Sequence, residues 1–495
     1  MILTKIKQFA ANVAPAISRS RLQGGRVIFI RLAAAGLGLA AQVLASRMLG
    51  AEAFGRYSLL LVWLLVLGSA STVGNGQLLC RYVAQYAKAN DRDSVAGLLR
   101  ASLATVLFFG VLFAGVAIGA LTLGLLGIQH HYTSLAVLAL CALPLVALQD
   151  YLEGIARGLD RPELGIAPAF LIRNLAIIFG LLSLSVMGEH ADAFTVMGFT
   201  LLGLVATVVT QAALLGSHIA KLLLGSSPRY EILKWGRTML PMAGADVTDL
   251  LLLNADILTL AMFVDPEYVA FYFAATRLAQ VLGYVPYGAK AATAQKYATL
   301  AAKSERTELQ SLIAKTANAS TILTALGAVV LISAADPLLS LFGEDFTVAA
   351  PTVALLCIGI VLSCAFGPGE DVLNMLGQER ICSLVFLLSL TTNVALNFAL
   401  IPHFGLEGSA LATCTALVLR AAILAYFAKT RLGLVLPAFV SSKVSARPPR
   451  DLAVDRRARC HFGTYSRRAP SPPAGAALTR PLIRKGAAGA EIASR

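Results

Sequence analysis

Residues 388–413 read LSLTTNVALNFALIPHFGLEGSALAT and decide the interpretation of the chain. An apolar helix that carries Asn393 and Asn397 reaches Pro402, turns at Gly405 and restarts as a run of small residues. A spacing of four places both amides on one helix face. Amides within hydrocarbon need a neighbouring helix or a polar cavity. The stretch therefore predicts a membrane hairpin whose amides either join helices or line a site.

The composition predicts an integral membrane protein. Of 495 residues, 57% are hydrophobic and 14% are charged, and the mean hydropathy is +0.74. Apolar runs of about 20 residues recur along most of the chain, and each is long enough to span a bilayer as a helix. Seven cysteines without a CxxC pair favour small buried side chains over disulfides or a metal site.

The net charge of +14 is concentrated at the C-terminal end. Residues 441–495 hold twelve Lys and Arg against three acidic residues. No nucleic-acid motif accompanies them, so we expect no nucleic-acid partner and a disordered basic tail near anionic lipid.

We expect an all-α membrane protein of about twelve transmembrane helices in two six-helix lobes. Lys and Arg gather in alternate loops, and the positive-inside rule then places both termini in the cytoplasm. Glu52 and Tyr57 recur at one common offset as Glu267 and Tyr272, which predicts two lobes of the same orientation. The expected segments are a basic N-terminus (1–27), a first lobe (28–222), a linker (223–237), a second lobe (238–436) and the tail (437–495).

The motifs N-x-x-x-N, I-P-x-F-G and G-S-A-x-A-T of the opening stretch resemble the last hairpin of polysaccharide flippases. These belong to the multidrug/oligosaccharidyl-lipid/polysaccharide exporter superfamily. The resemblance implies a MATE-like fold, a cationic central cavity and a lipid-linked oligosaccharide as substrate. Some members place a cation site between the seventh and eleventh helices, which here implies Asp246, Asp249 or Asp256 with Asn393 and Asn397, and the motif match favours Asp256.

Three carboxylates lie in the seventh expected span. Asp246, Asp249 and Asp256 fall within about 80° of arc on a helix, so we expect one wet face that carries all three. Two interpretations stay open for them, because such groups either couple transport to H⁺ or Na⁺ or pair with arginines.

Cationic and amide side chains accompany them in other spans. Arg31 and Gln42 share a face of the first span, and Arg277 shares a face with Gln280 and Tyr284 in the eighth. Arg173 lies early in the fifth span, where it is either part of the lumen or close to the cytoplasmic surface. We interpret the three arginines as diphosphate ligands. The alternative is that they snorkel or pair with Asp246 and Asp249.

The sequence predicts a transporter without a catalytic site, a cofactor or a nucleotide-binding loop. The preferred function is a bacterial inner-membrane flippase for polyprenyl-diphosphate-linked oligosaccharide, in O-antigen or exopolysaccharide biosynthesis. It would work beside a polysaccharide polymerase and chain-length machinery. An ion-coupled multidrug exporter, a flippase for a peptidoglycan precursor, an O-antigen polymerase or ligase, and a membrane scaffold are the alternatives.

Overall fold

The computed structural model describes residues 2–124, 133–303 and 305–440. Side chains are described from residue 33 onward, except those of residues 291, 292, 295 and 302. The expected tail lies almost wholly outside the described residues, and so does the side chain of Arg31.

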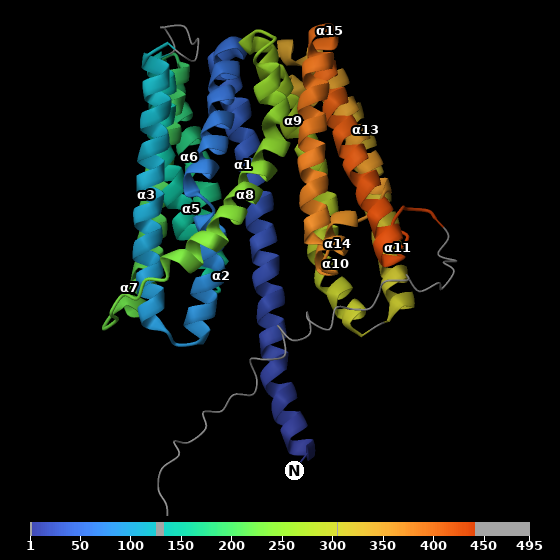
Figure 1. The fold of residues 1–495 in the computed structure, drawn as a ribbon. Helices are drawn as coiled ribbons and strands as arrows, with labels where there is room; N and C mark the ends of the chain where they lie inside the picture. The colour runs from blue at the N-terminus through green and yellow to red at the C-terminus, as the bar shows by residue number, and fades with distance from the viewer. Residues whose placement is uncertain (1, 125–132, 304, 441–495) are drawn as a thin grey trace, which may run out of the picture. The chain divides into compact units, whose positions relative to one another are not determined.

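Within the described ranges every regular element is helical, and the long helices run side by side (Figure 1). The elements of the first half are α1 (Ile2–Thr72), α2 (Asn75–Lys88), α3 (Arg92–Thr122), α4 (Thr133–Cys141), α5 (Leu143–Gly158), α6 (Pro162–Met187) and α7 (Ala193–Leu223). Those of the second half are α8 (Ile232–Leu260), α9 (Pro266–Leu282), α10 (Tyr284–Ala302), α11 (Arg306–Ser333), α12 (Ala335–Leu339), the 3₁₀ helix η2 (Glu344–Ala349), α13 (Ala350–Ala365), α14 (Gly369–Met375), α15 (Glu379–Phe427) and the π-helical turn η3 (Ala428–Leu432).

Two glycines divide the longest helices. Gly50 in α1 has φ 76° and Gly405 in α15 has φ 54°. Only glycine adopts such angles at little cost, so each helix reverses there into two arms. The arms of α15 pack closely, because a Cβ on Gly408 would lie 2.5 Å from the Leu400 carbonyl oxygen. The hairpin that the opening stretch predicts is confirmed.

Eight helical stretches in the described ranges are long and apolar enough to span a membrane. Two of them contain Gly50 and Gly405 and therefore supply two arms each. The aspartate-bearing α8 and the pair α9 and α10 fall outside this set; counted with it, they would give the twelve crossings expected. The all-α membrane fold is thus confirmed.

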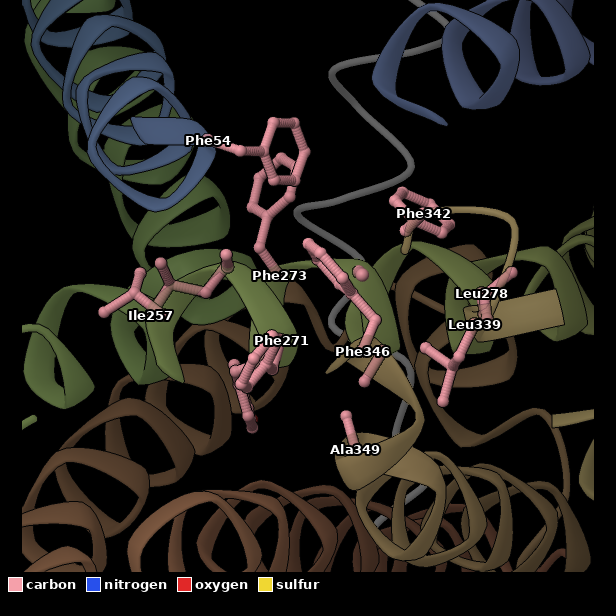
Figure 2. Packing of buried hydrophobic residues seen from close by; sticks show 14 of the residues in the cluster. Phe54, Ile257, Phe271, Phe273, Leu278, Leu339, Phe342, Phe346 and Ala349 are labelled. Carbon is pink, nitrogen blue, oxygen red and sulfur yellow. The ribbon is translucent and has the colours of Figure 1, made fainter. Parts of the chain in front are cut away.

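The two halves of the chain meet at the end where α1 reverses. Phe54 packs edge-on against Phe273 with ring centroids 5.9 Å apart, and Phe271 packs against Phe346 at 5.0 Å (Figure 2). Arg47 adds hydrogen bonds of 2.6 Å and 2.8 Å to the backbone carbonyl oxygens of residues 341 and 340. This cluster, the aromatic closure, seals the space between α1, α9 and η2 at that end.

Candidate functional site

A polar cavity lies between α1, α6 and α9, beneath the aromatic closure. It consists of two adjoining hollows of about 150 and 320 Å³. Both hollows are lined by Gly38, Gln42, Arg173, Asn174 and Arg277. The cavity therefore combines side chains from the first half of the chain with others from the second half.

Arg277 is held at the boundary of the two hollows. Its guanidinium lies over the Phe273 ring, 4.3 Å from the centroid, and donates to Gln280 Oε1 at 2.8 Å. The aromatic face and the amide fix the guanidinium plane. The Arg277 Nε and Gln42 Oε1 atoms are buried without a hydrogen-bond partner among the described residues. The cavity wall thus contains one donor and one acceptor whose hydrogen bonds are not made by the described residues.

Arg173 lies in the middle part of α6. It is the twelfth residue of α6, about 16 Å along the axis from Pro162. Its side chain lines both hollows of the cavity, in agreement with the interpretation that it is part of the lumen. Neither Arg173 nor Arg277 forms an ion pair with a described residue. The structure thus brings together Gln42, Arg173, Arg277 and Gln280, whereas the Arg31 side chain lies outside the described residues.

The lining of both hollows contains no aspartate or glutamate among the described side chains. Two permanently charged guanidinium groups face a space whose described lining holds no carboxylate, and the Asp256 carboxylate acts on Arg277 only from outside this lining. Such a site favours an anion, because burial strengthens electrostatic attraction and Arg supplies paired donors. A lipophilic cation would meet repulsion there.

Asp256 lies outside this cavity, in a buried hydrogen-bond network. Its side chain is 5% exposed, and its Oδ2 accepts from Tyr272 Oη at 2.8 Å and from Thr413 Oγ1 at 3.3 Å. Its Oδ1 accepts from the Ile257 backbone amide at 2.9 Å. The network joins α8 to α9 and to the second arm of α15.

The two asparagines of the opening stretch extend the same network. Asn393 Nδ2 donates to Thr413 Oγ1 at 3.1 Å, and Asn397 Nδ2 donates to Asn393 Oδ1 at 3.0 Å. Ser409 donates to Asn397 Oδ1 at 2.8 Å. The asparagines therefore join the arms of α15 and are also linked through Thr413 to Asp256.

The expectation of one wet face with three carboxylates is wrong. Asp256 is buried, while Asp246 and Asp249 line a separate hollow of about 360 Å³ toward the other end of α8. This hollow also holds Asp150, Glu153 and Arg157, with Arg157 3.7 Å from Glu153 and 3.9 Å from Asp150. Helix geometry predicts a common direction for residues ten apart. It does not give their surroundings, which differ because Asp246 and Asp256 lie about 15 Å apart along the helix axis.

Several charged groups that line these hollows were not predicted from the sequence. Asp150 and Glu153 are spaced i, i+3 in an apolar span, which is a signal of one helix face. Lys290 forms ion pairs of 2.9 Å with Glu370 and 3.2 Å with Asp371 beside a hollow of about 310 Å³. No local pattern joins Lys290 to acidic residues so distant in the chain, so only the fold reveals this cluster.

A family model described as polysaccharide biosynthesis protein matches residues 25–294. No curated protein matches the chain. An inward-facing multidrug resistance MATE family transporter of the MOP superfamily is similar in structure, with 17% identity and a TM-score of 0.64 over 82% of this chain and 98% of that one. Lipid II flippase MurJ, in an inward closed conformation, has 14% identity and a TM-score of 0.62 over 82% and 87% of the two chains.

A MOP superfamily transporter from Pyrococcus furiosus has 15% identity and a TM-score of 0.58, over 83% of this chain and 95% of that one. At these identities the likeness shows the fold. The family model covers more than half of the sequence and shows the family. The chain belongs to the polysaccharide biosynthesis protein family and has the fold of MOP superfamily transporters.

Proposed function

We propose that the protein is a flippase that moves polyprenyl-diphosphate-linked oligosaccharide across the bacterial inner membrane. The observation that carries this proposal is the cavity with Arg173 and Arg277, whose lining contains no carboxylate among the described side chains. A diphosphate offers several oxygens with full negative charge, and guanidinium groups bind such oxygens with paired donors. Gln42, Asn174 and Gln280 add amide groups of the kind that hydrogen-bond sugar hydroxyls.

Transport would proceed by alternating access of two lobes, residues 28–222 and 238–436. The aromatic closure holds the lobes together at one end, and substrate would enter from the other. Both termini and the 437–495 tail would face the cytoplasm. A polysaccharide polymerase and chain-length machinery would receive the flipped unit.

The buried network around Asp256 is the proposed coupling site. It gathers oxygen atoms from Asp256, Thr413 and Asn393, which suit either a proton or Na⁺. Asn397 positions Asn393 within it, and Asp246 and Asp249 remain second candidates at their own hollow. Arg31 stays a proposed ligand of the substrate on the grounds of its place in the first span.

The main rival is an ion-coupled multidrug exporter, since a multidrug transporter shares this fold. The unpaired arginines argue against it, because they repel the lipophilic cations that such exporters carry. An O-antigen polymerase or ligase is disfavoured by the absence of an evident nucleophile and base pair in the cavity lining of the described residues.

The test is complementation of a strain that lacks the protein, with surface polysaccharide and internal lipid-linked oligosaccharide both measured. Arg277→Ala removes a charged hydrogen-bond donor of about 1.5–3 kcal/mol, so we expect export to fall by about ten-fold or more, with lipid-linked units accumulating inside. Arg277→Lys keeps the charge and should retain part of the activity.

Arg380→Ala is the matched control, because Arg380 is exposed at the start of α15, away from the cavity lining. Full export by Arg277→Ala at a normal protein level would refute the diphosphate role. Unchanged polysaccharide together with raised sensitivity to cationic drugs would move the protein to the multidrug class.

A further inference from the structure

The two halves of the chain carry related polar side chains, with a carboxylate in the second half only. The offset that relates Tyr57 to Tyr272 also relates Ala41 to Asp256. Thr200 and Thr413 are related by nearly the same offset, so both members of the Tyr and Thr pair recur. The first half thus has a Tyr, a Thr and an alanine where the second half has a Tyr, a Thr and a carboxylate.

A short motif supports this correspondence. Residues 174–179 read NLAIIF and residues 393–398 read NVALNF, which aligns Asn174 with Asn393. Asn393 belongs to the Asp256 network, and Asn174 lines both hollows of the cavity. The residue before each asparagine differs, since it is Arg173 in the first half and a threonine in the second.

The hydrogen bonds of the two tyrosines show the effect of an alanine at position 41 where the second half has Asp256. In the second half, Tyr272 and Thr413 both donate to one oxygen of the Asp256 carboxylate, at 2.8 Å and 3.3 Å. In the first half, Tyr57 Oη lies 2.9 Å from Thr200 Oγ1, which also reaches a backbone carbonyl oxygen of its own helix at 2.9 Å. Both side chains are at most 2% exposed. The Tyr and Thr hydroxyls that serve an anion in the second half therefore meet no carboxylate in the first.

The hollow of about 150 Å³ lies against this pair. Its lining includes Ala41, Tyr57, Thr200 and Arg173, which come from α1, α6 and α7. One water takes roughly 30 Å³ in the liquid, so the hollow accommodates a group larger than a water molecule. Arg173 has no ion pair to a described residue, so its charge is available to a ligand.

We infer that Ala41, Tyr57, Arg173 and Thr200 form an anion subsite that takes one phosphate group. A phosphate oxygen of the ligand would accept the hydroxyl donors that an aspartate oxygen accepts in the second half. Arg173 would balance its charge, and the missing side chain at Ala41 leaves the room. The inference rests on the proposed flippase function and adds to it. It assigns one phosphate to this subsite and the neighbouring one to Arg277, which borders both hollows.

The test restores the missing carboxylate. Ala41→Asp would place a negative charge beside Arg173 and the two hydroxyls, so it should occupy the subsite from within. Ala41→Asn adds nearly the same volume without the charge, so the difference between the two variants isolates the electrostatic effect. The probe is farnesyl diphosphate, and its binding to the full-length protein in detergent is measured by calorimetry, with farnesol as the phosphate-free comparison.

We expect Ala41→Asp to bind farnesyl diphosphate at least ten-fold more weakly than Ala41→Asn. Equal affinities of the two variants would overturn the subsite. If Ala41→Asp does not fold, Tyr57→Phe and Thr200→Val remove the hydroxyls while keeping the shape. We expect a several-fold loss of affinity from each, and wild-type affinity in both would likewise overturn the subsite.

Two further measurements distinguish a failure of the subsite from a failure of the proposed function. Inorganic diphosphate should compete with farnesyl diphosphate. A lack of competition would assign binding to the prenyl chain and overturn the subsite. If the wild type binds farnesol as tightly as farnesyl diphosphate, the proposed function itself fails. If the wild type prefers the diphosphate and Arg277→Ala weakens it, but the Ala41 variants agree, only the subsite fails.

Discussion

Gly55 in α1 packs directly against the start of α9, and this contact gives a sharp prediction. A Cβ on Gly55 would lie 1.7 Å from the Pro266 carbonyl oxygen and 3.3 Å from the Ala270 backbone nitrogen. Real contacts of a Cβ are essentially never shorter than 3.0 Å, so Gly55→Ala must push α1 and α9 apart until the Cβ and the Pro266 carbonyl oxygen reach about that distance. Both contacts are backbone atoms, so no side chain can rotate away. Overpacking of this kind costs about 1–3 kcal/mol.

The separation would act on the aromatic closure, because Phe54 next to Gly55 packs against Phe273 of α9. We therefore expect Gly55→Ala to lower the apparent melting temperature in detergent, followed by tryptophan fluorescence, and to reduce export. Gly119→Ala is the matched control, since a Cβ there meets nothing within 4 Å and α3 has helical geometry at that residue. A Gly55→Ala protein that melts together with the wild type and Gly119→Ala would refute the packing argument.

Three further predictions concern polar groups. Asn397→Ala should destabilise the protein by about 1–3 kcal/mol, because it leaves the buried Ser409 hydroxyl and the side-chain oxygen of Asn393 without these hydrogen-bond partners. An unchanged melting temperature would contradict this. Lys290→Met should destabilise more than Lys290→Arg, because it leaves Glu370 and Asp371 without their shared cation, and equal melting temperatures would count against that role. Directly before α8, hydrogen bonds from Lys234 and then Tyr86 hold the pKa of Glu231 below its usual range. This contribution is therefore complete at neutral pH and is lost as the pH falls through the lowered pKa. In a Trp63→Phe background, Trp235 fluorescence should report the acid transition, since its Nε1 donates to Tyr86 Oη at 3.1 Å, and Glu231→Gln should remove the transition.

The sequence predicts the parts of the fold that depend on local properties. Apolar runs require helices in a bilayer, because backbone polar groups find no water there. Pro402 and Gly405 place the reversal of α15, and the spacing of Asn393 and Asn397 places both amides on the helix face that meets the other arm. These features follow from residues that are close in the chain.

The candidate site was predicted in part, for the same reason. Periodicity grouped Arg277 with Gln280, and the structure shows their hydrogen bond. The same periodicity grouped Asp256 with Asp246, although tertiary neighbours place one in a buried network and the other beside a polar hollow. A helical wheel gives direction around the axis, whereas burial depends on which helix lies opposite at each level.

The amino-acid sequence by itself thus determined that this is a polytopic helical membrane protein, because hydropathy, turn residues and helical spacing are local. Only the tertiary structure decided that Arg173 and Arg277 share one cavity whose described lining holds no carboxylate, and that Asp256 is hydrogen-bonded to Tyr272 and Thr413. Those contacts join helices that are far apart in the chain. The charge of the cavity depends both on the arginines that line it and on the carboxylates that the packing places elsewhere.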